Sequence, residues 1–214
     1  MDFIKDPHKI EEKSMEIIER KIRGFTFTPR QKPIVKRVVH ATGDSSYAAM
    51  LAFSPQAVEA ALSALLANEP IYCDVEMVRT GLSRLGLQQL GIKPVCLIHD
   101  LEIKKEAKKR GITRAMAAME HAVRECPDGG IFVIGNAPTS LFHLLRAVDE
   151  GRAKPALVIG VPVGFVGAAE AKELLTAYSL PWITVRGEKG GSPVAAAIVN
   201  ALVNLALESK EARA

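Results

Sequence analysis

The chain has 214 residues, of which 48% are hydrophobic and 24% charged, a composition typical of a globular protein and unlike a disordered one. Its formal net charge of +4 is small and its basic residues are mostly scattered, which disfavours nucleic acid as a partner. The 3 cysteines are widely spaced, which argues against a disulfide framework and for a reducing, cytoplasmic environment.

Two absences narrow the class of protein further. The segment from Met1 to Asp6 lacks the basic and then apolar layout of a secretory signal peptide. Charges or turn residues interrupt each apolar run before it reaches the length of a membrane span. We therefore expect a protein without a membrane partner.

The first predicted helix begins at Asp6-Pro7, because proline is tolerated at the first helical position. Ile10, Ile17 and Ile18 give this helix an apolar stripe, and Ser14 falls on or near the same face. A small polar residue there is either packed filler or a ligand contact, and the local sequence does not decide between the two.

The second predicted helix begins at Thr28-Pro29 and carries His40 near its end. Gly43 stands where a helix takes its left-handed closing residue, since glycine has no Cβ to clash there. His40 then lies in the last helical turn, where exposed carbonyls favour a protonated imidazole, with the carboxylate of Asp44 close by in sequence. His40 is thus a candidate proton donor, although a capping or packed histidine gives the same local pattern.

A third helix begins at Ser54-Pro55, and from residue 70 onward short apolar runs alternate with helical stretches. Continuous apolar runs are expected for strands that are covered on both faces. The alternation predicts a single α/β domain over residues 1–214, with a three-layer, mostly parallel sheet, helices on both faces and a solvated tail over 208–214. The strand candidates are 71–73, 95–98, 131–134, 156–159 and 182–185, and the later helices are 114–125, 139–150, 167–178 and 192–207.

Glycine-containing loops follow the last three predicted strands, at 135–139, 160–167 and 186–192. In a parallel sheet such loops emerge at the carboxyl edge, where open α/β folds bind ligands. Glycine allows close approach of a ligand to the backbone, and the helix after each loop offers N–H groups to anionic oxygens. Apolar residues in the loops and nearby cations predict a site for a large, flat molecule edged with carboxylates. The cations are Arg79, Arg84, Arg114, Arg186 and Lys189.

Known cofactor and metal motifs do not match. The loop 187–192 lacks the spacing of a P-loop, and no Gly-x-Gly-x-x-Gly opens the first helix. The histidines show no metal-ligand spacing with one another. We therefore expect no nicotinamide, flavin, S-adenosylmethionine or metal cofactor.

Six short segments, taken in their joint order, resemble the precorrin-8X methylmutases of cobalamin biosynthesis, including the cobalt-precorrin-8 methylmutases. The resemblance runs from about Ser14 to Leu205, nearly the whole chain. The segments are His40-Ala41-Thr42-Gly43-Asp44, Asp74-Val75-Glu76-Met77-Val78, Thr113-Arg114, Gly135-Asn136-Ala137-Pro138-Thr139, Gly160 to Gly167, and Arg186-Gly187 with Gly190-Gly191-Ser192.

The resemblance implies a homodimeric, three-layer α/β enzyme of flavodoxin-like type. Members of this family are isomerases that move a methyl group from C-11 to C-12 on ring C of precorrin-8X or cobalt-precorrin-8, giving hydrogenobyrinate or cobyrinate. No external methyl donor is needed, which agrees with the missing cofactor motifs. Some members have Ala-Cys-Gly after the histidine, and the version with Asp44 is more similar to the cobalt-containing branch.

The family's histidine matches His40, and its substrate-contacting serine and arginine match Ser14 and Arg114. We hypothesise that His40 lies in the cavity formed by the three late loops and acts there as a general acid at the ring C nitrogen of the tetrapyrrole, because this step needs a positioned proton. Further residues of the late loops are expected to position the corrinoid ring and its carboxylates. These are Asn136, Ala137, Gly164, Phe165 and Val166.

Two other classes of protein stay open on the sequence. One is another α/β enzyme at the same sheet edge, such as a methyltransferase, which would consume a methyl donor. The other is a corrinoid-binding or carrier protein, which would release its ligand unchanged. A shared fold does not decide between them.

Overall fold

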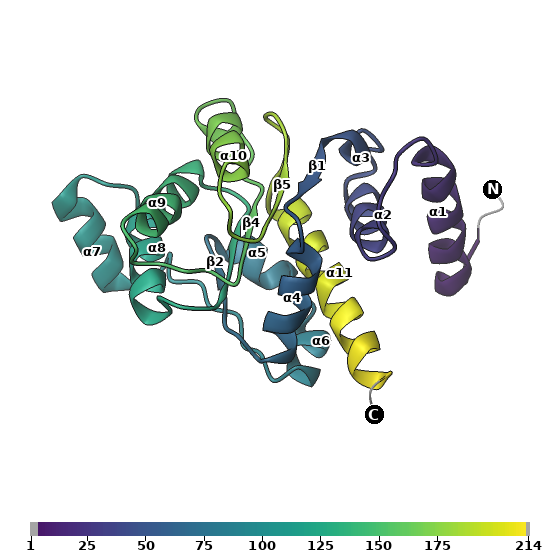
Figure 1. Cartoon of the computed structure of the whole chain (residues 1–214), viewed down its shortest axis with the longest axis horizontal. Coiled ribbons are helices and arrows are strands. Elements are labelled where there is room, and N and C mark those ends of the chain that lie inside the picture. The colour runs from purple at the N-terminus through teal and green to yellow at the C-terminus, as the bar shows by residue number, and fades with distance from the viewer. Residues whose placement is uncertain (1–3, 213–214) are drawn as a thin grey trace.

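A computed structural model describes residues 4–212, which form one five-stranded sheet with helices on both faces (Figure 1). Strands β2 to β5 run parallel to one another, whereas β1 runs antiparallel to β5 with Leu51 opposite Val185. The predicted mostly parallel α/β sheet is therefore confirmed. In sheet order, the strands are β1 (Leu51–Phe53), β5 (Trp182–Val185), β4 (Leu157–Gly160), β3 (Ile131–Ile134) and β2 (Ile71–Cys73).

The helices divide between the two faces of the sheet (Figure 1). One face packs against α8, α9 and α10, and the other packs against α2, α4 and α11. The helices are α1 (Pro7–Lys21), α2 (Gln31–Thr42), α3 (Tyr47–Met50), α4 (Ala57–Leu66), α5 (Glu76–Gly81), α6 (Arg84–Gln89), α7 (Leu101–Arg110), α8 (Arg114–Glu125), α9 (Pro138–Asp149), α10 (Ala168–Thr176) and α11 (Ser192–Glu211).

Alternate residues along each strand enter different hydrophobic clusters. Phe132 and Val158 belong to the cluster beneath α9, whereas Val133 and Ile159 belong to the cluster beneath α11, and all four are 0% exposed. Successive side chains of a strand point to opposite faces, so a strand buried on both faces must be apolar throughout. The predicted three layers are confirmed by this division.

Two strand predictions need correction. β1 was not expected, because this short strand begins directly after α3 with no turn signal between them. The run 95–98 is not a strand, and Val95 forms only an isolated parallel bridge with Tyr72. Pro94 has no N–H to give to a ladder, and the chain turns where Asp100 N–H donates to Leu97 O at 3.1 Å.

The position of Val95 also bears on the predicted flavodoxin-like topology. If its segment counts as the second parallel strand, the parallel segments follow the order 2-1-3-4-5 that is typical of flavodoxin-like folds. A single bridge does not make it a strand, so this part of the fold prediction is not established. In that order the direction in which successive strands are added across the sheet reverses between β2 and β3, and the carboxyl ends of these two strands lie side by side there.

Helix α11 is the central element of one layer. By length and composition it is apolar enough to cross a membrane, so the expectation that every apolar run is interrupted was wrong here. In the structure 61% of its apolar window is buried, against the sheet and helices such as α2 and α4. The helix continues to Glu211, four residues into the segment predicted as a tail, and Glu208, Lys210 and Glu211 there are exposed.

Helices α1 and α2 lie side by side beyond the β1 edge of the sheet (Figure 1). The Asp6 carboxylate caps α1 by accepting hydrogen bonds from the N–H groups of His8 and Lys9. The predicted apolar stripe of α1 is only partly buried, because Ile10 and Ile17 are 45% and 40% exposed. No neighbouring helix among residues 4–212 covers that part of α1, and ion pairs from Glu19 to lysines of α2 help to hold the two helices together.

Candidate functional site

His40 and Ser14 come together between α1 and α2. Both line a cavity of about 230 Å³, together with Ile17, Val39 and Gly43. His40 is exposed and lies in the last turn of α2, and Gly43 ends the helix with a left-handed φ of 66°. The predicted end of this helix is confirmed, and it presents the imidazole at the carbonyl end of the helix dipole.

Ser14 has a defined hydrogen-bonding role in this cavity. Its Oγ donates to the carbonyl oxygen of Ile10 at 2.8 Å, within the same helix. A hydroxyl has one proton and two lone pairs, so Ser14 is left with acceptor capacity toward the cavity. A ligand N–H or O–H is therefore the group that this serine can bind.

The carboxylate of Asp44 bonds to Lys189 and Ser46 and not to the imidazole of His40. Its carboxylate accepts hydrogen bonds from Lys189 Nζ at 2.5 Å and from the backbone N–H of Ser46 at 2.8 Å. The Lys189 ammonium, with Ser46, holds the pKa of this carboxyl well below its usual range. Asp44 is thus an ionised link between the end of α2 and the loop after β5.

The loops after β4 and β5 interlock at the carboxyl edge of the sheet. Gly191 N–H donates to Val161 O at 2.8 Å, and Gly164 N–H donates to Glu188 O at 3.2 Å. A Cβ on Gly190 would lie 2.3 Å from Val161 O, so only glycine allows the two loops to approach this closely. The predicted meeting of these loops at one edge is confirmed.

Phe165 and Val166 stand at the tip of the loop after β4. Each is 89% exposed, although both side chains are apolar. The neighbouring loop residues are held by backbone hydrogen bonds, so these two side chains project from an anchored support. Exposed apolar groups beside a candidate site are typical of surfaces that a ligand or another protein covers.

Asp74 fixes the loop after β3. It is 2% exposed, and its carboxylate accepts hydrogen bonds from the backbone N–H groups of Gly135, Asn136 and Ala137 at 3.0, 2.8 and 2.7 Å. Burial raises the pKa of this carboxyl, and the three amides act in the opposite sense. Because these amides are already bonded, the loop offers a ligand its side chains and carbonyls instead.

The sequence-based reasoning missed this role of Asp74. The residue was noted only as part of a motif, although a charged side chain directly after the buried run Ile71–Cys73 is an unusual signal. Asp74 lies at the β2 end and its partners lie at the β3 end, which is the place where the order of the parallel segments reverses.

Arg114 lies at the start of α8, next to the capping residue Thr113. The Thr113 Oγ1 and Thr139 Oγ1 atoms are 3.1 Å apart and share a hydrogen bond, which ties the start of α8 to the start of α9. Arg114 is exposed and therefore free to reach a carboxylate of a ligand near the loop that Asn136 belongs to.

The structure thus divides the predicted site residues between two places. His40 and Ser14 share the cavity between α1 and α2, whereas the remaining predicted residues lie on the late loops or at the start of α8. The expectation that His40 lies in the cavity of the late loops was wrong for a single chain, because among residues 4–212 these loops contribute no lining to the His40 cavity. Lys189 joins the two places through Asp44, and Tyr47 Oη adds a longer hydrogen bond of 3.5 Å to Gly190 O.

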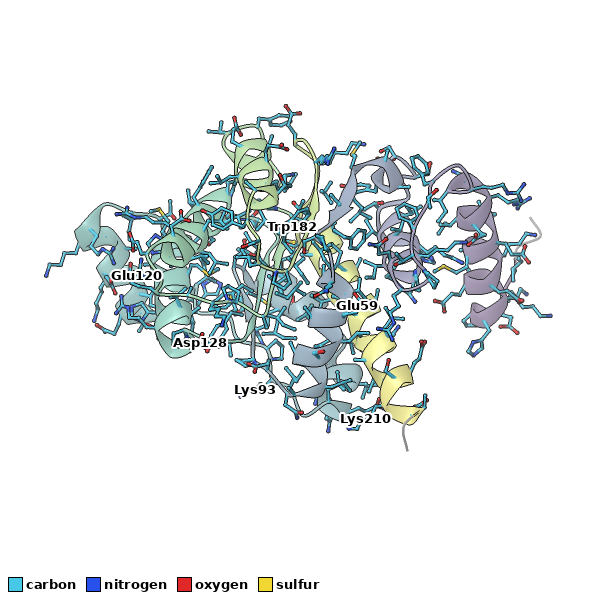
Figure 2. All side chains as sticks on the ribbon, in the orientation of Figure 1. Glu59, Lys93, Glu120, Asp128, Trp182 and Lys210 are labelled. Carbon is cyan, nitrogen blue, oxygen red and sulfur yellow. The ribbon has the colours of Figure 1, made fainter. Side chains whose placement is uncertain are left out.

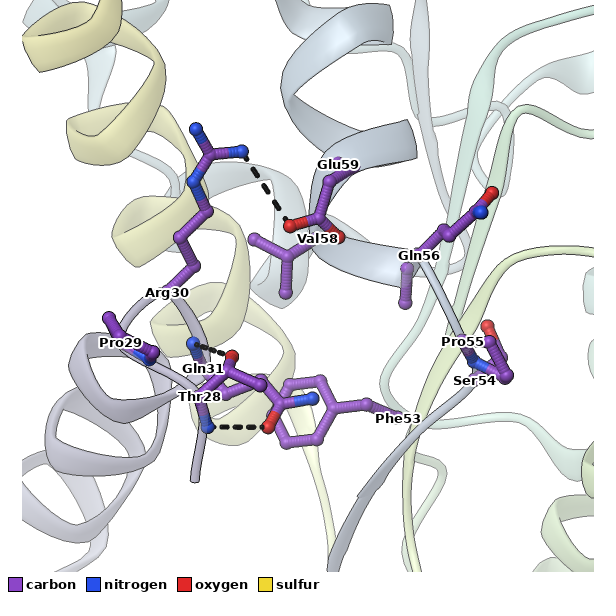
Figure 3. A pocket seen from close by; sticks show the side chains of 11 residues that line it. Thr28, Pro29, Arg30, Gln31, Phe53, Ser54, Pro55, Gln56, Val58 and Glu59 are labelled. Atoms are coloured by element: carbon purple, nitrogen blue, oxygen red, sulfur yellow. Dashed lines mark hydrogen bonds and ion pairs between the residues drawn. The ribbon is translucent and has the colours of Figure 1, made fainter. Parts of the chain in front are cut away.

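Two larger cavities of about 550 Å³ each lie elsewhere. One lies between the starts of α2 and α4, where Arg30 approaches Glu59 at 3.6 Å and Phe53 forms part of the wall (Figure 3). The other lies around α5 and α6 and includes Lys93, which is well removed from α1 and α2 (Figure 2). Cavity volume therefore does not identify the His40 cavity as the candidate site. The side chains of His40 and Ser14 that line it do.

Ligation of a metal has no support in the described part of the chain. Among residues 4–212, no three His, Cys, Asp or Glu side chains gather in a way that could hold a metal ion. His121 instead pairs with Glu106 at 2.7 Å, and His143 lies 3.4 Å from Glu120.

Known proteins share both the sequence and the fold of this chain. Residues 9–205 match the sequence model of the family described as Precorrin-8X methylmutase. The chain is 44% identical over 200 residues to a cobalt-precorrin-8 methylmutase of Priestia megaterium, with 94% of this chain and 88% of the relative covered. It is 42% identical over 204 residues to a precorrin-8X methylmutase of Pseudomonas aeruginosa, with 94% and 97% covered.

A solved structure titled as a precorrin-8X methyl mutase of Thermus thermophilus superposes with a TM-score of 0.87 at 40% identity, covering 94% of this chain and 98% of that one. A second, titled as a precorrin-8X methylmutase related protein, gives a TM-score of 0.81 at 32% identity, covering 89% and 99%. Identity of this degree over nearly the full length of both partners goes well beyond a shared fold. The chain therefore belongs to the precorrin-8X methylmutase family of isomerases.

Proposed function

We propose that this protein moves a methyl group from C-11 to C-12 on ring C of precorrin-8X or cobalt-precorrin-8, an isomerisation in cobalamin biosynthesis. The observation that carries the proposal is the pairing of His40 with Ser14 in one cavity, within a chain of the methylmutase family. These two residues come from different helices, and they are the ones that match the family's histidine and serine.

His40 acts as the general acid in this reaction. The methyl group breaks its bond to C-11 and forms a bond to C-12 within one molecule, so no group is gained or lost. A proton or strong hydrogen bond from His40 to the ring C nitrogen draws electron density toward that nitrogen, which favours the rearranged and more conjugated product. Positioned proton transfer typically contributes about 10²- to 10⁴-fold in rate.

The place of His40 in α2 supports this role. His40 lies in the last turn of α2, at the carbonyl end of the helix dipole, and Gly43 ends the helix there. Asp44 is occupied by Lys189, so the carboxylate does not compete with the ligand for the imidazole proton. Ser14 supplies an acceptor for a polar group on the same part of the ligand.

The remaining predicted residues bind the rest of the macrocycle. Arg114 pairs with a peripheral carboxylate, since a guanidinium forms two parallel hydrogen bonds with such a group. Asn136 and Ala137 lie on the loop held by Asp74, and Gly164, Phe165 and Val166 offer a backbone and apolar surface to the ring.

The working form is a homodimer. The His40 cavity of about 230 Å³ is smaller than the pockets that enclose drug-sized ligands, so one chain alone does not surround a tetrapyrrole. Exposed apolar side chains near the site, namely Ile10, Ile17, Phe165 and Val166, support coverage by the ligand and by a second copy. The enzyme works in the cytoplasm, without a membrane or nucleic-acid partner and without a cofactor.

The test is to incubate the purified chain with precorrin-8X and, separately, with cobalt-precorrin-8, in the absence of S-adenosylmethionine. We expect the visible spectrum to change while the mass of the tetrapyrrole stays the same. A requirement for a methyl donor, with a gain of one methyl in mass, would identify a methyltransferase. Recovery of the bound tetrapyrrole unchanged would identify a binding or carrier protein.

A further inference from the structure

A buried lysine outside the candidate site has no part in the chemistry described so far. Lys172 lies on α10 and is 1% exposed, which is rare for an ammonium group. Its Nζ donates a hydrogen bond to the backbone carbonyl of Lys189 at 2.5 Å. A buried charge costs stability unless it is compensated, and this hydrogen bond to Lys189 is the compensation that Lys172 receives.

The hydrogen bond of Lys172 ends on the residue that links the two halves of the site. Lys172 holds the backbone of Lys189, and the side chain of Lys189 holds Asp44 and lies 3.1 Å from Ser46 Oγ. Asp44 follows Gly43, the residue that closes the helix of His40. The contacts therefore run without a break from α10 to the C-terminal end of α2.

Other contacts anchor the loop that carries Lys189. The flanking residues of its loop bond to the loop after β4, through Gly164 N–H to Glu188 O and Gly191 N–H to Val161 O. The Lys189 ammonium also lies 5.7 Å from the centre of the Tyr47 ring, at the start of α3. A shift of the Lys189 backbone would thus move its ammonium relative to Asp44.

We propose that Lys172 is a positioning residue for the methyl shift, which fixes the loop after β5 against the end of α2 through Lys189 and Asp44. The inference rests on the proposed function of His40. Through this relay, Lys172 sets the placement of the imidazole relative to the glycine loops that hold the ring. Small displacements of a catalytic group reduce rate far more than they reduce binding.

The main variant is Lys172→Met, which has an unbranched side chain shorter by only one heavy atom and removes the donor. We expect kcat for the tetrapyrrole to fall about 10-fold, with KM nearly unchanged, because reacting groups lose alignment while most ring contacts remain. Glu173→Gln, on the exposed side of the same helix, is the matched control and should leave both constants unchanged.

A double-mutant cycle separates positioning from general damage. Lys189→Met cuts the next link at an exposed side chain, and it should lower kcat to a similar degree. Because both residues act through one path, the double variant should be no slower than the slower single variant. Multiplied effects, or an unchanged kcat in a folded Lys172→Met protein, would overturn the proposal.

Hydrogen–deuterium exchange gives a readout that needs no activity. Lys172→Met should speed the exchange of amides in the segments 42–47 and 186–192, while α8 and α9 keep the wild-type rate. If Lys172→Met does not fold, Asp44→Asn at the far end of the relay should speed exchange in the same two segments, and unchanged exchange there would refute the relay. A wild-type protein that fails to convert either substrate would refute the proposed function and leave the exchange test of the relay in force.

Discussion

Ser14 of α1 and His40 of α2 face one cavity, although they belong to different helices at the edge of the sheet. Ser14 has acceptor capacity there, and His40 is exposed at the carbonyl end of its helix. The pair therefore offers a ligand one acceptor and one proton donor within a small volume.

Replacing His40 should affect the rate and spare binding. His40→Ala removes the proton donor, and we expect kcat to fall by about 10²- to 10⁴-fold. Tetrapyrrole affinity, measured by absorbance titration, should stay within a few-fold of wild type, because the ring contacts of the late loops remain. His8→Ala, at the exposed start of α1, is the control. A wild-type rate in His40→Ala with bound ligand would remove His40 from the chemistry.

Replacing Arg114 should weaken tetrapyrrole binding more than it lowers the rate. Arg114→Ala removes one guanidinium–carboxylate pair, and charge-assisted bonds of this kind contribute about 1.5–3 kcal/mol each. We expect Kd to rise by roughly 10-fold or more, with a smaller change in kcat. Arg124→Ala, at the other end of α8, serves as the comparison. Equal affinity of Arg114→Ala and wild type would place Arg114 outside the binding surface.

Asp74 should matter for stability through the loop that it holds. Asp74→Ala leaves three buried or half-buried N–H groups without their acceptor, and each costs about 1–3 kcal/mol. We expect urea unfolding to show a loss of about 3 kcal/mol or more, whereas Asp74→Asn should lose less because it keeps one carbonyl acceptor. Asp128→Ala, which is exposed, should change little, and a similar result for Asp74→Ala would contradict this role.

Lys172 should make stability depend on pH in a defined window. Burial lowers the pKa of its ammonium from 10.5 to about 8, and Glu188 acts weakly in the opposite sense. At pH values between these two pKa values, Lys172 is protonated in the unfolded chain and deprotonated in the folded chain. The free energy of unfolding therefore increases as the pH rises. The gain is about 3 kcal/mol at most.

The measurement is urea unfolding of wild type and Lys172→Met at about pH 7 and about pH 10.5. The free energy of unfolding at the higher pH minus that at the lower pH should be larger for the wild type than for Lys172→Met, by up to the gain given above. Parallel pH profiles for the two proteins would show that Lys172 does not titrate in this window.

Two glycines should differ in their tolerance of a side chain. Gly190→Ala would place a Cβ 2.3 Å from Val161 O and 2.9 Å from Pro162 O, so the two late loops would have to separate. In Gly43→Ala the added Cβ would have no close neighbour. The only penalty is the left-handed φ, which costs about 1–2 kcal/mol. We expect urea unfolding to show the larger loss for Gly190→Ala. Equal losses would mean that the contact between the loops is not tight.

Local sequence patterns predicted much of the fold and the position of His40 at the end of its helix. The apolar run of α2 is buried as expected, with Ile34, Val35 and Val38 all 0% exposed, because a helix period reports which face is covered. Gly43 was recognisable for a similarly local reason, since its φ is left-handed.

Features that depend on distant partners could not be read in this way. β1 is defined by its pairing with β5, a strand about 130 positions later in the chain, and no turn signal separates it from α3. Asp74 acts on amides that lie far along the chain, and the partial burial of Ile10 and Ile17 depends on what packs beside α1. The gap between the His40 cavity and the late loops is likewise a matter of tertiary placement.

The pairing of β1 with β5 has a consequence for synthesis of the protein. The helix that carries His40 comes early in the chain, yet its buried stripe packs against α11, the last helix, and the strand after it docks on the last strand. A nascent chain on the ribosome therefore holds its histidine in place only after nearly every residue has emerged. Truncation at the C-terminus should abolish turnover even though it removes none of the residues that would touch the tetrapyrrole.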